Sequence, residues 1–287
     1  TVFGAAAPEL QLIDAAKKGD AGEVRSLIAK KVNVNAPASD TSTALHWAVE
    51  AGSLDAVNAL LDAGASATAK TRYNITPLSI ACEHGNEAII DRLLKAGADP
   101  NETSEEGQTA LMTAALNGRV EAVKLLLQRG AKINAIEPYR GQNALIMAAG
   151  EGNVTAIEML IECGADIKSK SKAGYTAILL AALNNRMDAV KTLLDHGANI
   201  EDKAPDGTTV LNVAIVNAYY DLASMLLDRG ANPNAEDPRG SALHSVIWLR
   251  KPGTSWEAAA LASDPEPVSR PTGRINHIQM ARKLLEK

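Results

Sequence analysis

The sequence predicts an all-α solenoid of about eight stacked helix-turn-helix units with hairpin-like loops, and two periodic patterns support this prediction. An aliphatic residue recurs every 32 to 34 residues, at Leu45, Leu78, Leu111, Leu145, Ile178, Leu211 and Leu243. A Gly-Ala pair recurs with nearly the same period, beginning at Gly64, Gly97, Gly130, Gly164, Gly197 and Gly230. Such a period is typical of arrays in which each unit buries its apolar face against its neighbours.

The first helix of each unit has recognisable start and end signals. Two residues before each recurring aliphatic residue stands one that can cap a helix by accepting a hydrogen bond from a free backbone amide, namely Thr43, Thr76, Thr109, Asn143, Thr176, Thr209 and Ser241. In the first two of these units, Gly52 and Gly85 follow the cap by nine residues and can adopt the left-handed conformation that ends a helix. We therefore expect a short first helix between each cap and its glycine.

A second helix is expected directly after each turn. Val57, Leu60 and Leu61 are spaced i, i+3 and i+4, which places them on one apolar stripe. In two neighbouring units, Asn185 and Ala218 replace the turn glycine. Because alanine adopts the left-handed conformation at a cost of about 1 kcal/mol, we expect either a local distortion at this turn or sequence drift that the fold tolerates.

These residues resemble the ankyrin repeat, whose pattern runs Gly-x-Thr-Pro-Leu-His-x-Ala, a turn ended by glycine, and Leu-Leu-x-x-Gly-Ala-Asp-x-Asn. Specific matches stand at 76–78, 97–101 and 230–234, and the resemblance covers nearly the whole chain. It implies a helix, a tight turn, a second helix and a hairpin-like loop in each unit. It also implies that His46 and His244 hydrogen-bond between neighbouring loops.

The expected organisation is an end segment followed by one array. Its parts are a signal-peptide remnant or disordered end at 1–7, a single array at 8–287, an N-terminal capping repeat at 8–36, six full repeats at 37–235 and an eighth repeat at 236–287. The first repeat is interpreted as a cap because it lacks the Thr-Pro-Leu-His start and carries two pairs of lysines. Because no Gly-Ala pair closes the last unit, we expect the array to continue beyond Lys287.

An insertion at about 250–274 separates the two helices of the eighth repeat. It contains four prolines, which favour a loop, and we expect one helical turn at 256–262. Long loops inside regular arrays are often functional. The basic residues of the insertion favour an acidic partner or a docking role, and the alternative is a simple surface excursion.

Composition excludes several function classes. A net charge of -5 disfavours sequence-independent nucleic-acid binding, and no run of about 18 apolar residues could span a membrane. Phosphate-binding glycine loops, Cys-x-x-Cys pairs, His-Glu-x-x-His helices and nucleophile elbows are absent from the sequence. We therefore expect a non-enzyme with no catalytic residue, cofactor or metal ion.

The two cysteines and the N-terminal residues bear on the compartment. Cys82 and Cys163 lie two repeats apart, so we expect them to be unpaired and to act as small buried hydrophobes. Three alanines at 5–7 have the small-residue pattern of a signal-peptidase site. This pattern predicts a periplasmic or secreted bacterial protein, with the cytoplasm as the alternative.

In ankyrin proteins, partners usually contact the loop tips and the exposed inner face of each first helix. Applied position by position, this rule selects Arg72, Ile75, Glu83, Glu105, Glu106, Gln108, Leu116 and Asn117 among others. Because Tyr, Trp and Arg are frequent interface anchors, the partner-binding residues that we predict are Tyr73, His84, Tyr139, Arg140, Tyr175, Asn184, Trp248 and Trp256. The alternative for the tyrosines is that they merely cover neighbouring loops.

The resulting functional prediction is a monomeric, non-catalytic scaffold that binds a partner protein of unknown identity. One alternative is the targeting arm of a larger protein with a catalytic domain beyond residue 287. Another is a groove for a small molecule or glycan, which would require a closed pocket rather than an open surface.

Overall fold

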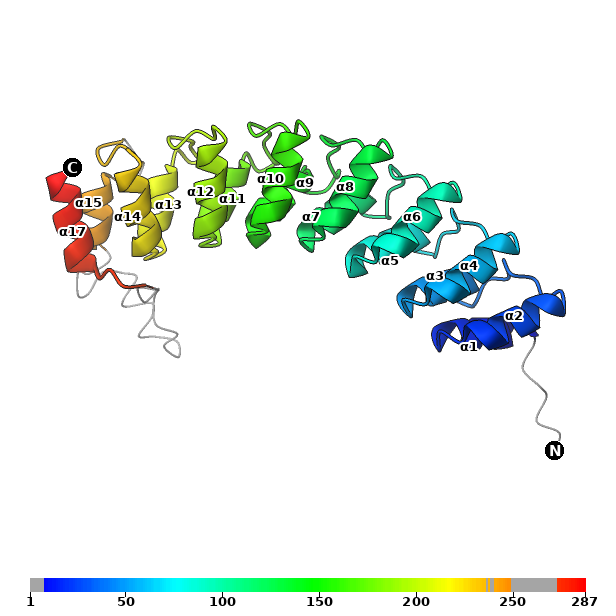
Figure 1. Cartoon of the computed structure of the whole chain (residues 1–287). Helices are drawn as coiled ribbons and strands as arrows, with labels where there is room; N and C mark the ends of the chain where they lie inside the picture. The colour runs from blue at the N-terminus through cyan, green and yellow to red at the C-terminus, as the bar shows by residue number, and fades with distance from the viewer. Residues whose placement is uncertain (1–7, 236, 238–239, 249–272) are drawn as a thin grey trace. The chain divides into compact units, whose positions relative to one another are not determined.

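The computed structural model describes residues 8–235, 237, 240–248 and 273–287 (Figure 1). In these ranges every named element is an α-helix, and the only β-type pairing consists of three isolated bridges, the first joining Thr103 and Thr109. The helices follow one another as short pairs joined by tight turns, which confirms the predicted all-α repeat fold.

The chain forms two compact units. The first comprises the chain up to Ala144 together with Glu158–Ala165, and the second comprises Leu145–Ile157 together with the residues from Asp166 onward. Two helices, α9 (Ala144–Glu151) and α10 (Val154–Glu162), contribute residues to both units.

In the first unit the helices alternate between two layers. The first layer contains α1 (Pro8–Lys17), α3 (Ala44–Glu50), α5 (Pro77–His84) and α7 (Ala110–Leu116), and the second contains α2 (Ala21–Ala29), α4 (Leu54–Asp62), α6 (Glu87–Lys95) and α8 (Val120–Gln128). Within each layer, every helix packs against the next, as α3 does against α5 and α6 against α8. The loops that precede the first-layer helices continue the exposed side of that layer, and we call the combined surface the inner surface.

The second unit repeats this arrangement. Its first-layer helices are α11 (Ala177–Leu183), α13 (Val210–Val216) and α15 (Ala242–Trp248), and its second-layer helices are α12 (Met187–Asp195), α14 (Tyr220–Asp228) and α17 (His277–Glu286). The last helix packs against both α15 and α14. The insertion that separates α15 from α17 lies mostly outside the described residues, including the helical turn expected at 256–262.

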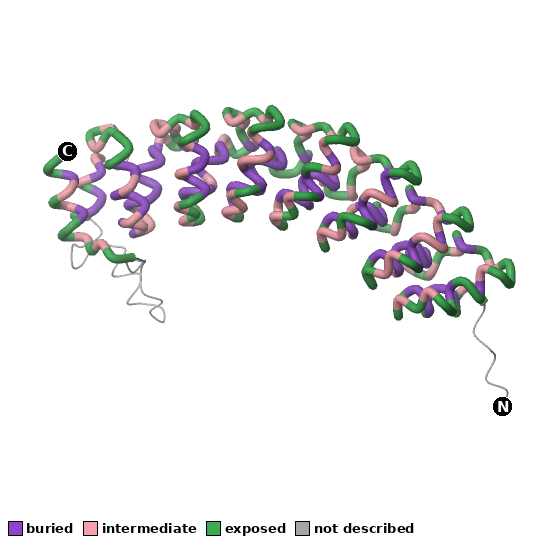
Figure 2. Tube along the Cα trace, viewed as in Figure 1, coloured by how far each residue is buried: buried purple, intermediate pink, exposed green. Residues whose placement is uncertain are grey.

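The core is thin and lies between the helices of each unit (Figure 2). It is built from aliphatic residues and alanine, with Leu60, Leu93 and Leu126 fully buried in successive second-layer helices of the first unit. Alanine at 48, 81, 114 and 115 in the first-layer helices is also buried, which allows the helices to approach closely. Burial of this kind supplies most of the stabilisation of such short helices.

The capping prediction is confirmed at several first-layer helices. Thr76, Thr109 and Thr209 each accept a hydrogen bond from the backbone amide three residues later, at 3.2 to 3.3 Å. Thr176 instead donates its hydroxyl hydrogen to Asp202 Oδ2 at 2.9 Å and makes no cap bond. The prediction is therefore wrong at Thr176, whose side chain joins its helix to the following loop.

The two turns without glycine keep the same geometry as the others. Asn185 and Ala218 adopt φ values of 55° and 57°, in the left-handed region, and their amides donate to the carbonyls three residues earlier. The distortion expected at this turn is therefore absent. Ala218 is 2% exposed, so burial of its methyl group, worth about 0.8 kcal/mol, offsets much of the conformational cost.

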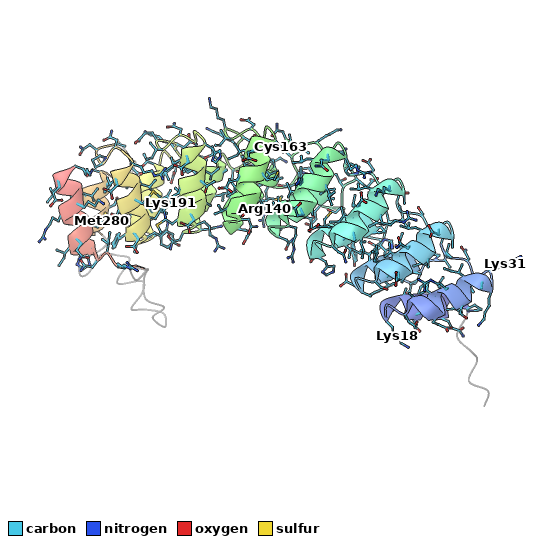
Figure 3. All side chains as sticks on the ribbon, viewed as in Figure 1. Lys18, Lys31, Arg140, Cys163, Lys191 and Met280 are labelled. Carbon is cyan, nitrogen blue, oxygen red and sulfur yellow. The ribbon has the colours of Figure 1, made fainter. Side chains whose placement is uncertain are left out.

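The cysteines behave differently from one another. Cys82 is buried in α5, and burial strongly raises the pKa of its thiol, so it acts as a small hydrophobe as predicted. Cys163 is exposed after the end of α10, and the prediction of burial is wrong for it (Figure 3). It stands immediately before a Gly-Ala pair, the position that the exposed residues Ala96 and Arg129 occupy in other repeats.

His46 joins two neighbouring loops of the first unit, which confirms the role that the ankyrin resemblance implies. Its Nδ1 accepts a hydrogen bond from the Thr43 amide at 3.1 Å, and its Nε2 lies 3.1 Å from the Ile75 carbonyl oxygen. An amide can only donate and a carbonyl can only accept, so the ring is neutral with its proton on Nε2. His244 is exposed, and the loop that follows its helix lies outside the described residues.

The burial of His46 predicts a loss of stability in mild acid. Desolvation lowers the pKa of His46 below its usual value. The unfolded chain therefore binds more protons as the pH falls through about 6.5, and the free energy of unfolding falls with it. We expect urea denaturation to show this decline between about pH 8 and pH 5, and a His46→Gln variant to show a smaller one. Equal pH dependence in the two proteins would exclude this role, and His84→Gln serves as the exposed control.

Candidate functional site

A groove with a volume of about 520 Å³ lies on the inner surface of the first unit, and we call it the α5–α7 groove. Its floor comes from the exposed sides of α5 and α7, and its walls come from the loops that precede them. The lining residues are Tyr73, Ile75, Ser79, Ile80, Glu83, Ser104, Glu105, Glu106, Gln108, Thr113, Leu116 and Asn117. Eight of these twelve residues belong to the positions selected from the sequence or to the predicted anchors.

Hydrogen bonds within the loops hold the two walls of the groove. The Thr71 hydroxyl accepts the Ile75 amide at 3.2 Å, and the Ser104 hydroxyl accepts the Gln108 amide at 3.2 Å. The two loops are also joined, because the Glu105 amide donates to the Tyr73 carbonyl at 3.1 Å. The short side chains of Thr71 and Ser104 thus order the loop backbones that carry the groove-lining residues.

The polar side chains of the groove floor are hydrogen-bonded to their own helices. Ser79 Oγ donates to the Thr76 carbonyl at 2.8 Å, and Thr113 Oγ1 donates to the Thr109 carbonyl at 3.3 Å. The Asn117 side-chain amide donates to the Thr113 carbonyl at 2.9 Å. These contacts leave mainly apolar side chains and carboxylates to face a ligand.

The next loop of the first unit, residues 137–142, is organised by a buried glutamate. Glu137 is 3% exposed, and its carboxylate accepts hydrogen bonds from the backbone amides of Tyr139, Arg140 and Gln142. The Glu137 amide in turn donates to the Gln142 carbonyl at 3.0 Å, which closes the loop. A carboxylate in this position supplies the acceptors that the loop backbone needs away from water.

Sequence reasoning missed Glu137, although the sequence contains a signal for it. The distance from Leu111 to Leu145 is 34 residues, one more than in the neighbouring repeats, and the extra residue falls in this loop. In the shorter loop before α7, the Ser104 hydroxyl accepts one amide, whereas the longer Glu137 side chain reaches three. The result is a solvent-exposed loop tip on which Tyr139 is 84% exposed, next to Arg140 (Figure 3).

The other predicted anchors of the first unit are also exposed. Tyr73 is 57% exposed at the wall of the α5–α7 groove. His84, at the end of α5, lies outside the groove lining, and its Nε2 is 3.2 Å from Glu50 Oε2. Half of each of these two side chains is open to solvent, so the pair holds His84 only weakly.

Three further predicted anchors belong to the second unit. Tyr175 is half-buried, and its amide donates to the Ser171 hydroxyl at 3.1 Å. The Asn184 side-chain amide donates to the Gly150 carbonyl at 2.8 Å, so this side chain supports the end of α9. Trp248 is the last residue of α15, and Trp256 lies outside the described residues.

Asp221, in α14, binds the end of the insertion. Sequence reasoning did not single out this residue. Its carboxylate accepts hydrogen bonds from the backbone amides of Arg274 and Ile275 at 3.0 to 3.2 Å. Lys283 in the helix that follows contacts Asp228 Oδ2 at 2.5 Å. Together these contacts fix α17 against α14.

The part of the chain that the structure describes contains no cluster of His, Cys, Asp and Glu that could hold a metal ion. None of its helices is both long enough and apolar enough to be a candidate membrane span.

The chain is similar to known ankyrin repeat proteins in sequence and structure. The family model for ankyrin repeats (3 copies) matches residues 10–75, 78–171 and 145–237. No curated protein matches the sequence. Among solved structures, the human ASB11 ankyrin repeat domain is 24% identical with a TM-score of 0.65, and the alignment covers 85% of this chain and 99% of that one.

A second solved structure is the ankyrin repeat domain of Bcl-3, which is described as a unique member of the IkappaB protein family. It is 28% identical with a TM-score of 0.63, and the alignment covers 73% of this chain and 94% of that one. The match to the family model extends over more than half of the residues, from the first helix to the loop before α15. The chain therefore belongs to the ankyrin repeat family.

Proposed function

We propose that this chain is a non-catalytic scaffold that binds a partner protein through its inner surface and loop tips. The ankyrin repeat is a general protein-interaction fold, and the feature that carries the proposal for this chain is the loop at 137–142. There, a buried carboxylate orders a loop whose tip exposes a tyrosine to solvent. Neither the core nor the stacking of the helices requires an aromatic ring at that place.

The physical advantage of this arrangement is pre-organisation. Fixing the backbone of one residue costs about 1 to 2 kcal/mol, and a loop that is already ordered does not incur this cost on binding. Tyrosine and arginine are also the side chains that contribute most often to interface hot spots. Tyr139 and Arg140 are therefore the residues for which we expect the largest loss of affinity on truncation to alanine.

The alternatives gain no specific support. The α5–α7 groove is an open depression with exposed walls, whereas a site for a small molecule or glycan normally encloses most of its ligand. A role as the targeting arm of a larger protein would use the same surface. It would change only what the array is attached to.

Affinity capture from extracts of the source cell, followed by mass spectrometry, tests the proposal. We expect the parent chain to enrich a protein that a Tyr139→Ala/Arg140→Ala/Tyr175→Ala variant does not. A Lys124→Ala/Lys191→Ala variant is the matched control, because both lysines lie on second-layer helices, where Lys124 is exposed and Lys191 is half-buried, and it should capture the same protein. Capture of an identical set by all three proteins would refute the assignment of the surface.

A further inference from the structure

The α5–α7 groove has one sign of charge and a partly apolar lining. It contains the carboxylates of Glu83, Glu105 and Glu106, and no Lys, Arg or His is among its lining residues. All three glutamates are exposed, and none of them forms an ion pair with a residue that the structure describes. The apolar part of the groove lining comes from Tyr73, Ile75, Ile80 and Leu116.

On the second-layer helices of the first unit, in contrast, two carboxylates form ion pairs. Asp62 lies 2.6 Å from an Arg92 guanidinium nitrogen, and Asp91 lies 2.7 Å from one of Arg129. A basic residue of the following repeat thus neutralises each of these two acidic residues. The three groove carboxylates form no such ion pair with a described residue, so they present negative charge at an open, partly apolar surface.

The arginines that adjoin the groove are hydrogen-bonded to backbone carbonyls. Arg72 donates to the Ser39 carbonyl at 2.8 Å, in the preceding loop. Arg119 Nε donates to the Glu83 carbonyl at 3.0 Å, which stabilises the end of α5. Neither guanidinium lines the groove, and each makes its hydrogen bond to a backbone carbonyl and not to a groove carboxylate.

We propose that the α5–α7 groove binds a basic segment of the partner protein, in which Lys or Arg side chains flank an aliphatic residue. This inference rests on the proposed function and specifies the chemistry of the partner. The aliphatic side chain contacts Ile80 and Leu116 on the floor. The flanking cations pair with the glutamates of the two walls, and an Arg side chain also stacks on the Tyr73 ring.

Charge complementarity at an open rim acts mainly on specificity and on the rate of association. An acidic segment would bring like charges together on this surface, and a purely apolar segment would leave the three carboxylates partly desolvated without partners. A basic segment with an aliphatic centre is the one occupant that satisfies both the charges and the apolar floor. Its affinity should fall as salt screens the exposed pairs.

Selection from a phage-displayed library of short random peptides tests the inference. The parent chain should enrich peptides with Lys or Arg beside Leu, Ile or Val, and a synthetic copy of an enriched peptide should bind more weakly at high salt. A Glu83→Gln/Glu105→Gln/Glu106→Gln variant should bind this peptide about tenfold more weakly or worse. A Glu83→Lys/Glu105→Lys/Glu106→Lys variant should instead enrich acidic peptides.

The matched control is Asp55→Asn/Glu87→Gln/Glu121→Gln, which changes the net charge equally but alters exposed residues in second-layer helices. It should keep the affinity of the parent. Enrichment of peptides without a basic preference would overturn the inference. Equal loss of peptide affinity in Glu83→Gln/Glu105→Gln/Glu106→Gln and in this control would also overturn it. If a captured protein still depends on Tyr139 and Arg140 in that case, the proposed function stands and only the chemistry of the groove is wrong. If no protein is captured and no peptide is enriched, both fail.

Discussion

A Glu137→Ala variant is expected to lose about 3 kcal/mol of stability in the loop at 137–142 and in the helices that the loop packs on. The substitution removes a buried carboxylate that accepts three backbone amide hydrogens. A methyl group cannot accept a hydrogen bond, so these amides are left unpaired unless the loop opens to water. Glu137→Gln keeps one acceptor oxygen but turns an NH₂ group toward the donors, so an intermediate loss is expected.

Amide hydrogen exchange measures this effect locally, which matters because a repeat array need not unfold in one step. In the parent chain, the amides of Tyr139, Arg140 and Gln142 should exchange slowly, and in Glu137→Ala they should exchange at nearly the rate of an unstructured peptide. The variant should also bind the captured partner more weakly, because the loop must then be ordered on binding. Unchanged exchange at all three amides would contradict the role assigned to Glu137.

A Gly107→Ala variant is expected to be destabilised more than a Gly130→Ala variant, although both glycines have the same backbone requirement. Their φ values are 77° and 85°, so alanine at either position costs about 1 to 2 kcal/mol in conformational strain. A Cβ atom at Gly107 would also lie 2.1 Å from Pro138 Cδ, whereas one at Gly130 would meet no atom within 4 Å. The clash adds about 1 to 3 kcal/mol.

Thermal denaturation of the two variants separates these effects. The difference in melting temperature between them reports the contact between the loop at 104–108 and the loop at 137–142. Because Pro138 immediately precedes Tyr139, Gly107→Ala should also weaken partner binding, whereas Gly130→Ala should not. Equal melting temperatures would mean that the two loops move apart easily, and the close approach at Gly107 would then have no structural importance.

The repeat period was sufficient to predict the helices, because caps, turns and apolar stripes are local features of the chain. It also selected Glu83, Glu105 and Leu116 as inner-face positions, and these residues line the α5–α7 groove, since a regular array presents equivalent positions on the same surface. Exposure of Cys163 could have been inferred in the same way, from the equivalent positions of Ala96 and Arg129. The prediction that Cys163 is buried was wrong because it relied on the residue type and not on the position in the repeat.

Contacts between repeats were harder to predict. The Thr176 hydroxyl donates a hydrogen bond to the Asp202 carboxylate, 26 residues away. The Asn184 side-chain amide donates one to the Gly150 carbonyl, 34 residues away. Neither contact follows from local propensity, because each depends on how far one side chain reaches into the neighbouring unit. The role of Glu137 was missed for a related reason, since only the folded loop brings three amides toward one carboxylate.

Hydrogen exchange of the parent chain with and without the captured partner tests most directly whether the inner surface binds protein. We predict that the partner slows exchange in the loops at 71–75, 104–108 and 137–142. Protection should be absent from the exposed sides of the second-layer helices α4, α6 and α8. Protection confined to those second-layer helices, with the three loops unchanged, would contradict the account.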